Sequence, residues 1–127
     1  MDQVNRPTVL IADDENHIRV LMKTAMTKLG FQVVGLATDG QEAVDLYRKT
    51  KPGLLLLDIN MPVKTGEAAL KEILSQNPDG RIIMLTSVAD TETVMECINE
   101  GAVNYIRKDT PLKEIMKIIR DTWVALH

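Results

Sequence analysis

Short apolar runs and longer amphipathic segments take turns along the chain. The short runs are rich in leucine or β-branched residues and predict five strands, at about 8–12, 31–38, 54–57, 81–86 and 104–108. In the segments that follow them, apolar residues recur at helical spacing and predict five helices, at about 17–29, 41–49, 65–76, 91–100 and 111–123. Strands that alternate with helices through short loops predict an α/β fold, with a parallel sheet and helices on both of its faces.

The third apolar run has leucine at all four positions 54–57, between Pro52-Gly53 and Met61-Pro62. A strand that is apolar on both faces is typical of the middle of a parallel sheet. Because right-handed crossovers leave few topologies, we expect a flavodoxin-like, doubly wound five-stranded sheet in the order 2-1-3-4-5. The fifth run is shorter and more polar, so we expect it at an edge.

Turn and cap residues indicate where some helices begin or end. Gly30 is expected to end the first helix, and the polar cluster 13–16 can cap its start. Thr110 is expected to cap the last helix, with Pro111 at the first helical position.

Composition is that of an ordinary globular domain. The 127 residues suit one domain, 1–127 with a core of about 8–123, and 45% of them are hydrophobic and 26% charged. The net charge is −3 and the basic residues are scattered, so there is no electrostatic signature of binding to nucleic acid or membrane. No apolar run approaches the roughly 18 residues needed to cross a bilayer. Cys97 is the only cysteine, which excludes an internal disulfide and agrees with a cytoplasmic location.

Acidic residues end two of the predicted strands. Asp13 and Asp14 follow the first strand, and Asp58 ends the third. In the expected order these strands are neighbours, so their carboxylates meet at the rim of the sheet where such folds bind ligands. Two unit charges about 4 Å apart repel by roughly 4 kcal/mol at an effective dielectric near 20, so either a proton or a cation is expected among them. An all-oxygen cluster without His or Cys suits Mg²⁺, and the backbone carbonyl of Asn60 is a further candidate ligand.

Thr86 and Lys108 end the fourth and fifth strands at the same rim. A hydroxyl and an ammonium beside a metal-bound carboxylate can bind the oxygens of a phosphoryl group, and a carboxylate can itself accept that group as an acyl phosphate. Each residue also has a simpler interpretation. The acidic pair can start a helix, Thr86 can cap one, Lys108 can be a solvated lysine and Tyr105 a packed, half-buried aromatic.

Together these residues resemble the receiver domain of two-component response regulators, most simply the single-domain chemotaxis type, over about 8–123. The resemblance implies that Asp58 is the phosphoacceptor and receives its phosphoryl group from a histidine kinase or a histidine phosphotransfer protein. It implies a Mg²⁺ site made by the three aspartates and the Asn60 carbonyl, with Asp14 as the direct ligand of the acidic pair.

The same resemblance assigns the signalling roles. Thr86 is similar to the switch hydroxyl, Lys108 to the lysine that pairs with the phosphate, and Tyr105 to the aromatic that turns inward when Thr86 moves. The face made by the fourth helix, fifth strand and fifth helix then binds a downstream protein or a fused output domain. The resemblance implies a protein that phosphorylates and dephosphorylates itself, not a turnover enzyme.

The chain departs from the family pattern after the lysine. Lys108 is followed by Asp109 instead of proline, and a cis bond without proline costs about 3–4 kcal/mol, so we expect a trans bond there. We expect Asp109 to draw the Lys108 ammonium away from the site in the resting state. The ending Lys-Asp-Thr-Pro resembles receivers attached to helix-turn-helix outputs, which is compatible with a piece of a longer regulator.

Three residues near the predicted site bear on how long a phosphoryl group persists. Ser87 stands where alanine or glycine is common in the family, which changes little. Asn60 and Val88 flank the expected approach of an attacking water and should influence the phosphoryl lifetime.

Three other functions use some of the same features. A Mg²⁺-dependent aspartyl phosphohydrolase needs a second carboxylate near the nucleophile, where Asp58-Ile59-Asn60 offers an amide, and it usually has a cap domain. A constitutive interaction module would not need the full set of site residues. A flavin or nucleotide binder would need a glycine-rich loop after the first strand, which the chain lacks.

Overall fold

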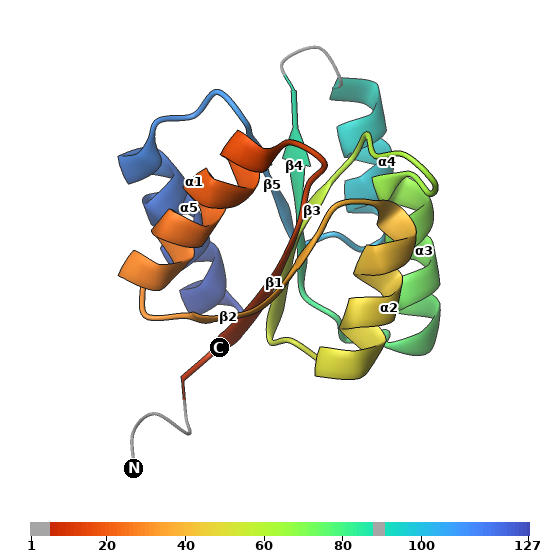
Figure 1. Cartoon of the computed structure of the whole chain (residues 1–127), viewed down its shortest axis with the longest axis horizontal. Helices are drawn as coiled ribbons and strands as arrows, with labels where there is room; N and C mark the ends of the chain where they lie inside the picture. Colours follow the sequence, from red (N-terminus) through yellow and green to blue (C-terminus); the bar gives the residue numbers. More distant parts are fainter. Residues whose placement is uncertain (1–5, 88–90) are drawn as a thin grey trace.

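The computed structural model describes residues 6–87 and 91–127, in which strands and helices alternate along the chain (Figure 1). The strands are β1 (Thr8–Ala12), β2 (Gln32–Ala37), β3 (Leu54–Asp58), β4 (Ile82–Thr86) and β5 (Asn104–Arg107). The helices are α1 (Asn16–Lys28), α2 (Gly40–Thr50), α3 (Gly66–Gln76), α4 (Thr91–Glu100) and α5 (Leu112–Ala125). All ten predicted elements are confirmed, with ends that differ by a few residues at most.

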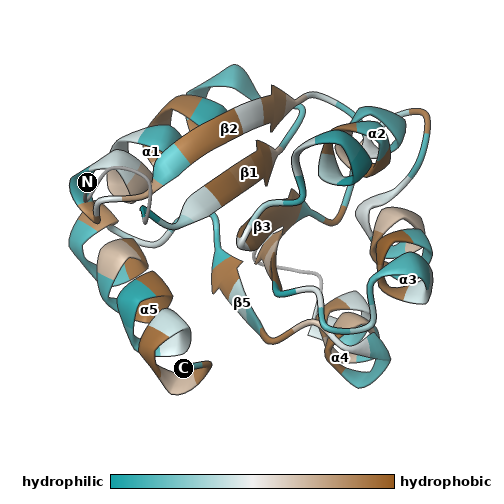
Figure 2. Cartoon of the chain, turned by 90° about the horizontal axis from the view of Figure 1, so that it is seen from below, coloured by the Kyte–Doolittle hydropathy of each residue, from teal (hydrophilic) through white to brown (hydrophobic). Residues whose placement is uncertain are grey.

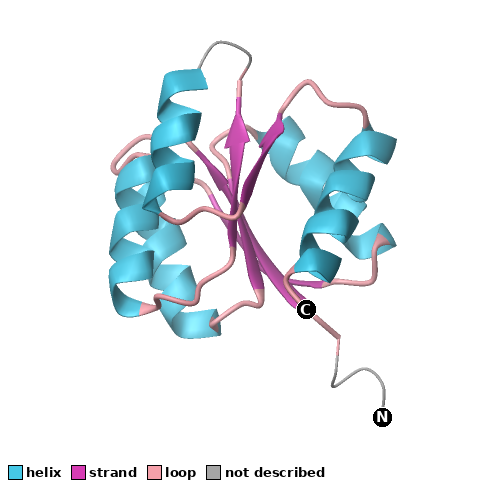
Figure 3. Ribbon diagram, turned by 180° about the vertical axis from the view of Figure 1, so that it is seen from behind, coloured by secondary structure: helices cyan, strands magenta, loops and turns pink. Residues whose placement is uncertain are grey.

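The five strands form one parallel sheet in the order β2-β1-β3-β4-β5, as predicted. Helices α1 and α5 cover one face, and α2, α3 and α4 cover the other (Figures 1 and 3). The polar strand β5 lies at an edge, as its composition predicts. Among the described residues, no helix is long and apolar enough to cross a membrane.

The core explains the run of leucines in β3. Leu55 and Leu57 pack in the hydrophobic layer under α2, α3 and α4, and Leu54 and Leu56 pack in the layer under α1 and α5. Because successive side chains of a strand point to opposite faces, a strand covered on both sides needs apolar residues at every position. Figure 2 shows hydrophobic residues along the strands and hydrophilic residues over much of the outer helix surface.

The start of α5 differs from the prediction. Pro111, not Thr110, is the N-cap residue, and the helix begins at Leu112 without a side-chain cap. Proline has an extended backbone here, with φ −61° and ψ 149°, so it precedes the first helical residue. The backbone N–H of Thr110 instead donates to the carbonyl of Arg107 and closes the turn after β5.

Candidate functional site

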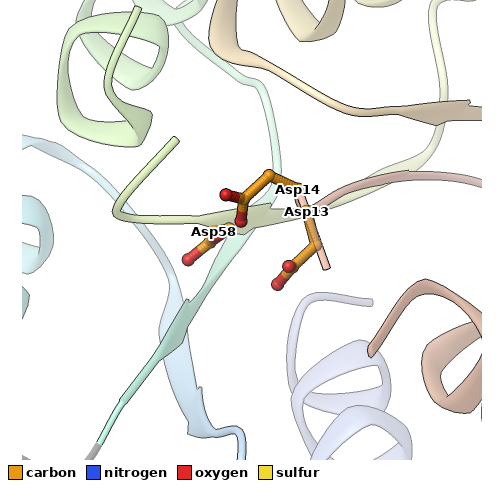
Figure 4. A group of neighbouring side chains, drawn as sticks. All are labelled: Asp13, Asp14 and Asp58. Atoms are coloured by element: carbon orange, nitrogen blue, oxygen red, sulfur yellow. The ribbon is translucent and has the colours of Figure 1, made fainter. Parts of the chain in front are cut away.

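The sheet brings the acidic ends of β1 and β3 together. Ala12 pairs with Leu57 in the register of these two strands, so the residues that follow, Asp13 and Asp58, leave the sheet side by side. Oxygen atoms of Asp13, Asp14 and Asp58 all lie within 4.8 Å of one another, and Figure 4 shows the three side chains gathered at the end of β3. Asp13 and Asp58 are buried, whereas Asp14 is exposed. The predicted acidic cluster is therefore present.

Lys108 bridges this cluster from the end of β5. Its Nζ lies 2.9 Å from Asp13 Oδ2, 3.0 Å from Asp58 Oδ1 and 2.9 Å from Glu15 Oε1. The strand pairing explains its position, because the N–H of Lys108 donates to the carbonyl of Thr86 at the end of β4. The ammonium is thus within ion-pair distance of the residue predicted to accept a phosphoryl group.

The predicted role of Asp109 is wrong. Its carboxylate forms a two-pronged ion pair with Arg107, at 2.9 and 3.2 Å, and does not draw the Lys108 ammonium out of the site. At the end of an edge strand, side chains two residues apart point to the same side, so Arg107 is the nearer partner. The Lys108-Asp109 bond is trans, as predicted.

Burial and like charge set the protonation of the site. Burial, with the Asp13 charge in addition, raises the pKa of Asp58 to about 7, against the opposing effect of Lys108 and the Asn60 N–H. Burial also raises the pKa of Asp13. Burial acts to lower the pKa of Lys108, but the attraction of the three nearby carboxylates of Glu15, Asp13 and Asp58 outweighs this and raises it. Hydrogen bonding to Lys108 lowers the pKa of Glu15.

The donor set suits a hard divalent cation. Two buried carboxylate oxygens, Asp13 Oδ2 and Asp58 Oδ2, accept no hydrogen bond from the described residues, and only the first has an ion pair with Lys108. Buried anionic oxygens in this state are costly unless a cation or a proton reaches them. With the exposed Asp14 carboxylate beside them, they offer the hard oxygen ligands that Mg²⁺ prefers. Asn60 donates its N–H to Asp58 Oδ1 at 3.3 Å, which places its backbone at the same site.

Thr86 and Tyr105 line one pocket between α4 and β5, together with Ser87, Thr91, Val94, Met95 and Arg107. The buried Thr86 hydroxyl donates to the carbonyl of Ser87 at 3.0 Å. Tyr105 is 43% exposed, so its ring is turned out more than the half-buried packing considered from the sequence. A second pocket lies over the carboxylates and is lined by Asp14, Glu15, Asp58, Asn60, Ser87 and Lys108. Val88, expected to flank the site, lies outside the described residues.

Two residues near the site were not predicted. Glu15 contacts Lys108, and its place in the acidic loop after β1 was a usable signal. Gly66 donates its N–H to the carbonyl of Ile59 at 2.7 Å, and a Cβ on it would lie 1.8 Å from the carbonyl oxygen of Asp58. Only glycine lets the start of α3 approach the Asp58 backbone this closely.

A doubly wound sheet with an acidic cluster at its switch point, bridged by a lysine from the edge strand, defines a receiver-type signalling domain. The sequence profile of the response regulator receiver domain matches residues 9–120, and the chain belongs to this family. The chemotaxis protein CheY of Thermotoga maritima is 40% identical over 100 residues, 79% of this chain and 83% of the relative. CheY of Bacillus subtilis is 35% identical over 114 residues, 90% of this chain and 95% of the relative.

A solved structure supports the same assignment. The crystal structure of the CheX-CheY-BeF3-Mg²⁺ complex from Borrelia burgdorferi contains a chain with a TM-score of 0.87 and 27% identity. The match covers 92% of this chain and 89% of that one. The predicted fold and the resemblance to receiver domains are therefore confirmed.

Proposed function

We propose that this chain is a phosphoacceptor switch in a two-component phosphorelay. Asp58 accepts a phosphoryl group from a histidine kinase or a histidine phosphotransfer protein in the cytoplasm. The face formed by α4, β5 and α5 then controls a partner protein or an output domain. The observation that supports this most strongly is the buried Asp58 carboxylate, with one oxygen 3.0 Å from Lys108 Nζ and the other without a hydrogen bond from the described residues.

The transfer step follows from these positions. A carboxylate oxygen of Asp58 attacks phosphorus, the new O–P bond forms, and the bond from phosphorus to the donor breaks with its electron pair leaving on the donor. Lys108 is placed to pair with the phosphoryl oxygens, and Thr86 stands at the adjacent strand end with a hydroxyl to offer. Asp13, Asp14, Asp58 and the Asn60 carbonyl are the proposed Mg²⁺ ligands, and the bound ion would neutralise charge on the phosphoryl oxygens.

The test is phosphoryl uptake from acetyl phosphate in the presence of Mg²⁺, measured by intact-protein mass spectrometry. Wild type should gain one phosphoryl group, and Asp58→Asn should gain none because an amide is not a nucleophile at this pH. Asp45→Asn is the control, since among the described residues the partners of this exposed carboxylate, Gln41 and Arg48, both lie on its own helix α2. A phosphoryl group retained on Asp58→Asn would place the acceptor elsewhere.

For the switch, we propose that a phosphoryl group on Asp58 draws the Thr86 hydroxyl away from the Ser87 carbonyl, so that Tyr105 can turn into the shared pocket. To change from 1:99 to 99:1, the active packing must be favoured by about 5.5 kcal/mol. Beryllofluoride, an acyl-phosphate mimic, should shift the amide NMR signals of α4 and β5 in wild type but not in Asp58→Asn. Unchanged signals in wild type that has bound the mimic would refute the switch.

An aspartyl phosphohydrolase is a weaker candidate. Such an enzyme needs an acid/base carboxylate near the nucleophile, and Asn60 occupies that position with its N–H bonded to Asp58. Turnover of many phosphoesters per chain would support it nonetheless.

A further inference from the structure

Glu15 is tied to the site by more than its place in the sequence. Its carboxylate Oε1 accepts a hydrogen bond from Lys108 Nζ at 2.9 Å, across 93 positions of the chain. Its backbone N–H donates to Asp13 Oδ1 at 2.8 Å, and Arg19 holds the Asp13 carbonyl at 2.7 Å. These hydrogen bonds fix the backbone of the loop after β1, and in this conformation the Glu15 side chain points toward Lys108.

Three carboxylates compete for the Lys108 ammonium, and among the described residues Glu15 alone accepts a hydrogen bond from it, whereas Asp13 and Asp58 lie at ion-pair distance. A lysine ammonium carries three N–H groups and no acceptor, and three carboxylate oxygens surround this one at 2.9, 2.9 and 3.0 Å. An incoming phosphoryl oxygen must compete with these carboxylates for the ammonium, and the N–H that points at Glu15 becomes available to it only if that hydrogen bond is released. The carboxylate that must give up its contact with Lys108 is the one that slows phosphoryl transfer.

Solvent exposure indicates which contact yields. Asp13 and Asp58 are buried, so either would lose its pairing without water to replace it. The Glu15 side chain is 46% exposed, whereas that of Lys108 is 14% exposed. Water can solvate the Glu15 carboxylate after it separates from the ammonium, so this contact breaks at the smallest cost.

We propose that Glu15 is a positioning residue that holds the Lys108 ammonium in the resting state and slows phosphoryl uptake at Asp58. This inference rests on the proposed function, because it concerns the rate of the same transfer. It assigns to Glu15 the resting-state role that the sequence suggested for Asp109.

Three variants separate this restraint from a general effect of charge. Glu15→Gln keeps the length of the side chain and removes its charge. Glu15→Asp keeps the charge and shortens the reach to Lys108. Asp109→Asn also removes a negative charge close to Lys108 in the sequence. The Asp109 carboxylate, however, pairs with Arg107 and not with Lys108. The measurement is the initial rate of phosphoryl uptake from acetyl phosphate at saturating Mg²⁺, as a function of donor concentration and at low and high salt.

We expect Glu15→Gln and Glu15→Asp both to raise the maximal rate, by about two- to fivefold, the range set by the strength of a part-exposed ion pair. Asp109→Asn should leave it unchanged. The same two Glu15 variants should bind beryllofluoride more tightly by a similar factor, with denaturation midpoints close to that of wild type. A merely structural role would move the midpoint and not the affinity.

Three results would overturn the inference. Rates unchanged or lowered in both Glu15 variants would show that Glu15 does not restrain Lys108. Faster uptake in Glu15→Gln and Asp109→Asn but not in Glu15→Asp, lost at high salt, would show a charge effect on donor encounter. If wild type takes up no phosphoryl group at all, the proposed function itself is refuted, and this inference with it. The first two results leave the proposed function intact, so the two kinds of failure can be told apart.

Discussion

At the scale of single residues, Asp58 carries opposing influences that set its protonation. Burial and the charge of Asp13 favour the neutral carboxyl, while Lys108 and the Asn60 N–H favour the carboxylate. The residue is only 2% exposed, so water does little to screen these effects. The balance leaves a pKa of about 7, far above that of an ordinary aspartate.

This pKa predicts a pH dependence of stability in Mg²⁺-free buffer. Because the pKa of Asp58 is raised in the folded state from 3.8 to about 7, the native state binds more protons between these values. The contribution of Asp58 to the free energy of unfolding is therefore fully present below about pH 4 and is expected to fall by about 2–4 kcal/mol as the pH rises from there through 7. Urea denaturation followed by the fluorescence of Trp123, the single tryptophan, measures it.

Asp58→Asn is the matched variant for this dependence. It should be more stable than wild type at pH 7.5 and should show a smaller fall with pH, since the large contribution of Asp58 is gone and the raised pKa values of Asp13 and Glu67 remain to give a slope of the same sign. Equal slopes in the two proteins would contradict the raised pKa of Asp58.

The sequence predicted the positions of those site residues that lie at the carboxyl ends of strands. The carboxyl ends of parallel strands share one rim, so the pattern alone placed Asp13, Asp58, Thr86 and Lys108 together. The acidic loop after β1 signalled that Glu15 lies near the site, but its contact with Lys108, 93 positions away, depends on the direction of two long side chains. Hydrophobic periodicity carries no information on such directions.

At the scale of elements, the turn between β3 and α3 is under backbone strain. Val63 has a φ of +69°, and the Lys64 N–H donates to the carbonyl of Pro62 at 2.7 Å, which closes a three-residue turn. A positive φ is unfavourable for a β-branched residue, and γ-turns of this kind are rare. The sequence pattern predicted a loop here but not its strain, because nothing in Met61-Pro62-Val63-Lys64 signals a left-handed residue.

Val63→Asn should therefore stabilise the protein by about 0.5–1 kcal/mol, since asparagine tolerates this conformation and valine does not. Val63 is 82% exposed, so little apolar burial is lost. Val124→Asn is the control, because Val124 is also exposed but lies in regular helix α5 and should show no gain. Urea denaturation of the two variants gives the comparison, and equal changes would argue against strain at Val63.

Gly66 provides the opposite test in the same connection. Gly66→Ala should destabilise the fold by about 2 kcal/mol or more, because the added Cβ would lie 1.8 Å from the carbonyl oxygen of Asp58 and force α3 away from β3. Gly53→Ala, whose nearest contacts would be 3.3 Å, should cost less than about 1 kcal/mol. Thermal denaturation followed by circular dichroism measures both, and equal losses would show that the close approach at Gly66 is not needed.

At the scale of the whole molecule, two hydrophobic layers cover the faces of the sheet, while repulsion among the carboxylates at its rim opposes folding. Alternation of side chains along β1 and β3 fills both layers, and this is why the fold was predictable from hydrophobic pattern alone. The same topology forces the three aspartates into one site, where their mutual repulsion opposes the packing that created it. The sequence therefore implied both the fold and the site where like charges meet.

A cation that binds the folded state alone should relieve this repulsion. Mg²⁺ at ten times its dissociation constant should stabilise the protein by about 1.4 kcal/mol, measured as a shift in melting temperature against NaCl of equal ionic strength. Asp14→Asn should lose most of the shift and change the metal-free stability little, because Asp14 is exposed, and Asp45→Asn should keep the shift.

The Mg²⁺ shift should also grow between pH 6 and pH 8. A proton on Asp58 and the cation compete for the same carboxylate, and the pKa of about 7 places that competition in this range. A shift of equal size at both pH values, or one that survives in Asp14→Asn, would mean that the stabilising ion binds somewhere other than the acidic cluster. Phosphoryl transfer at Asp58 would then need another source of charge neutralisation.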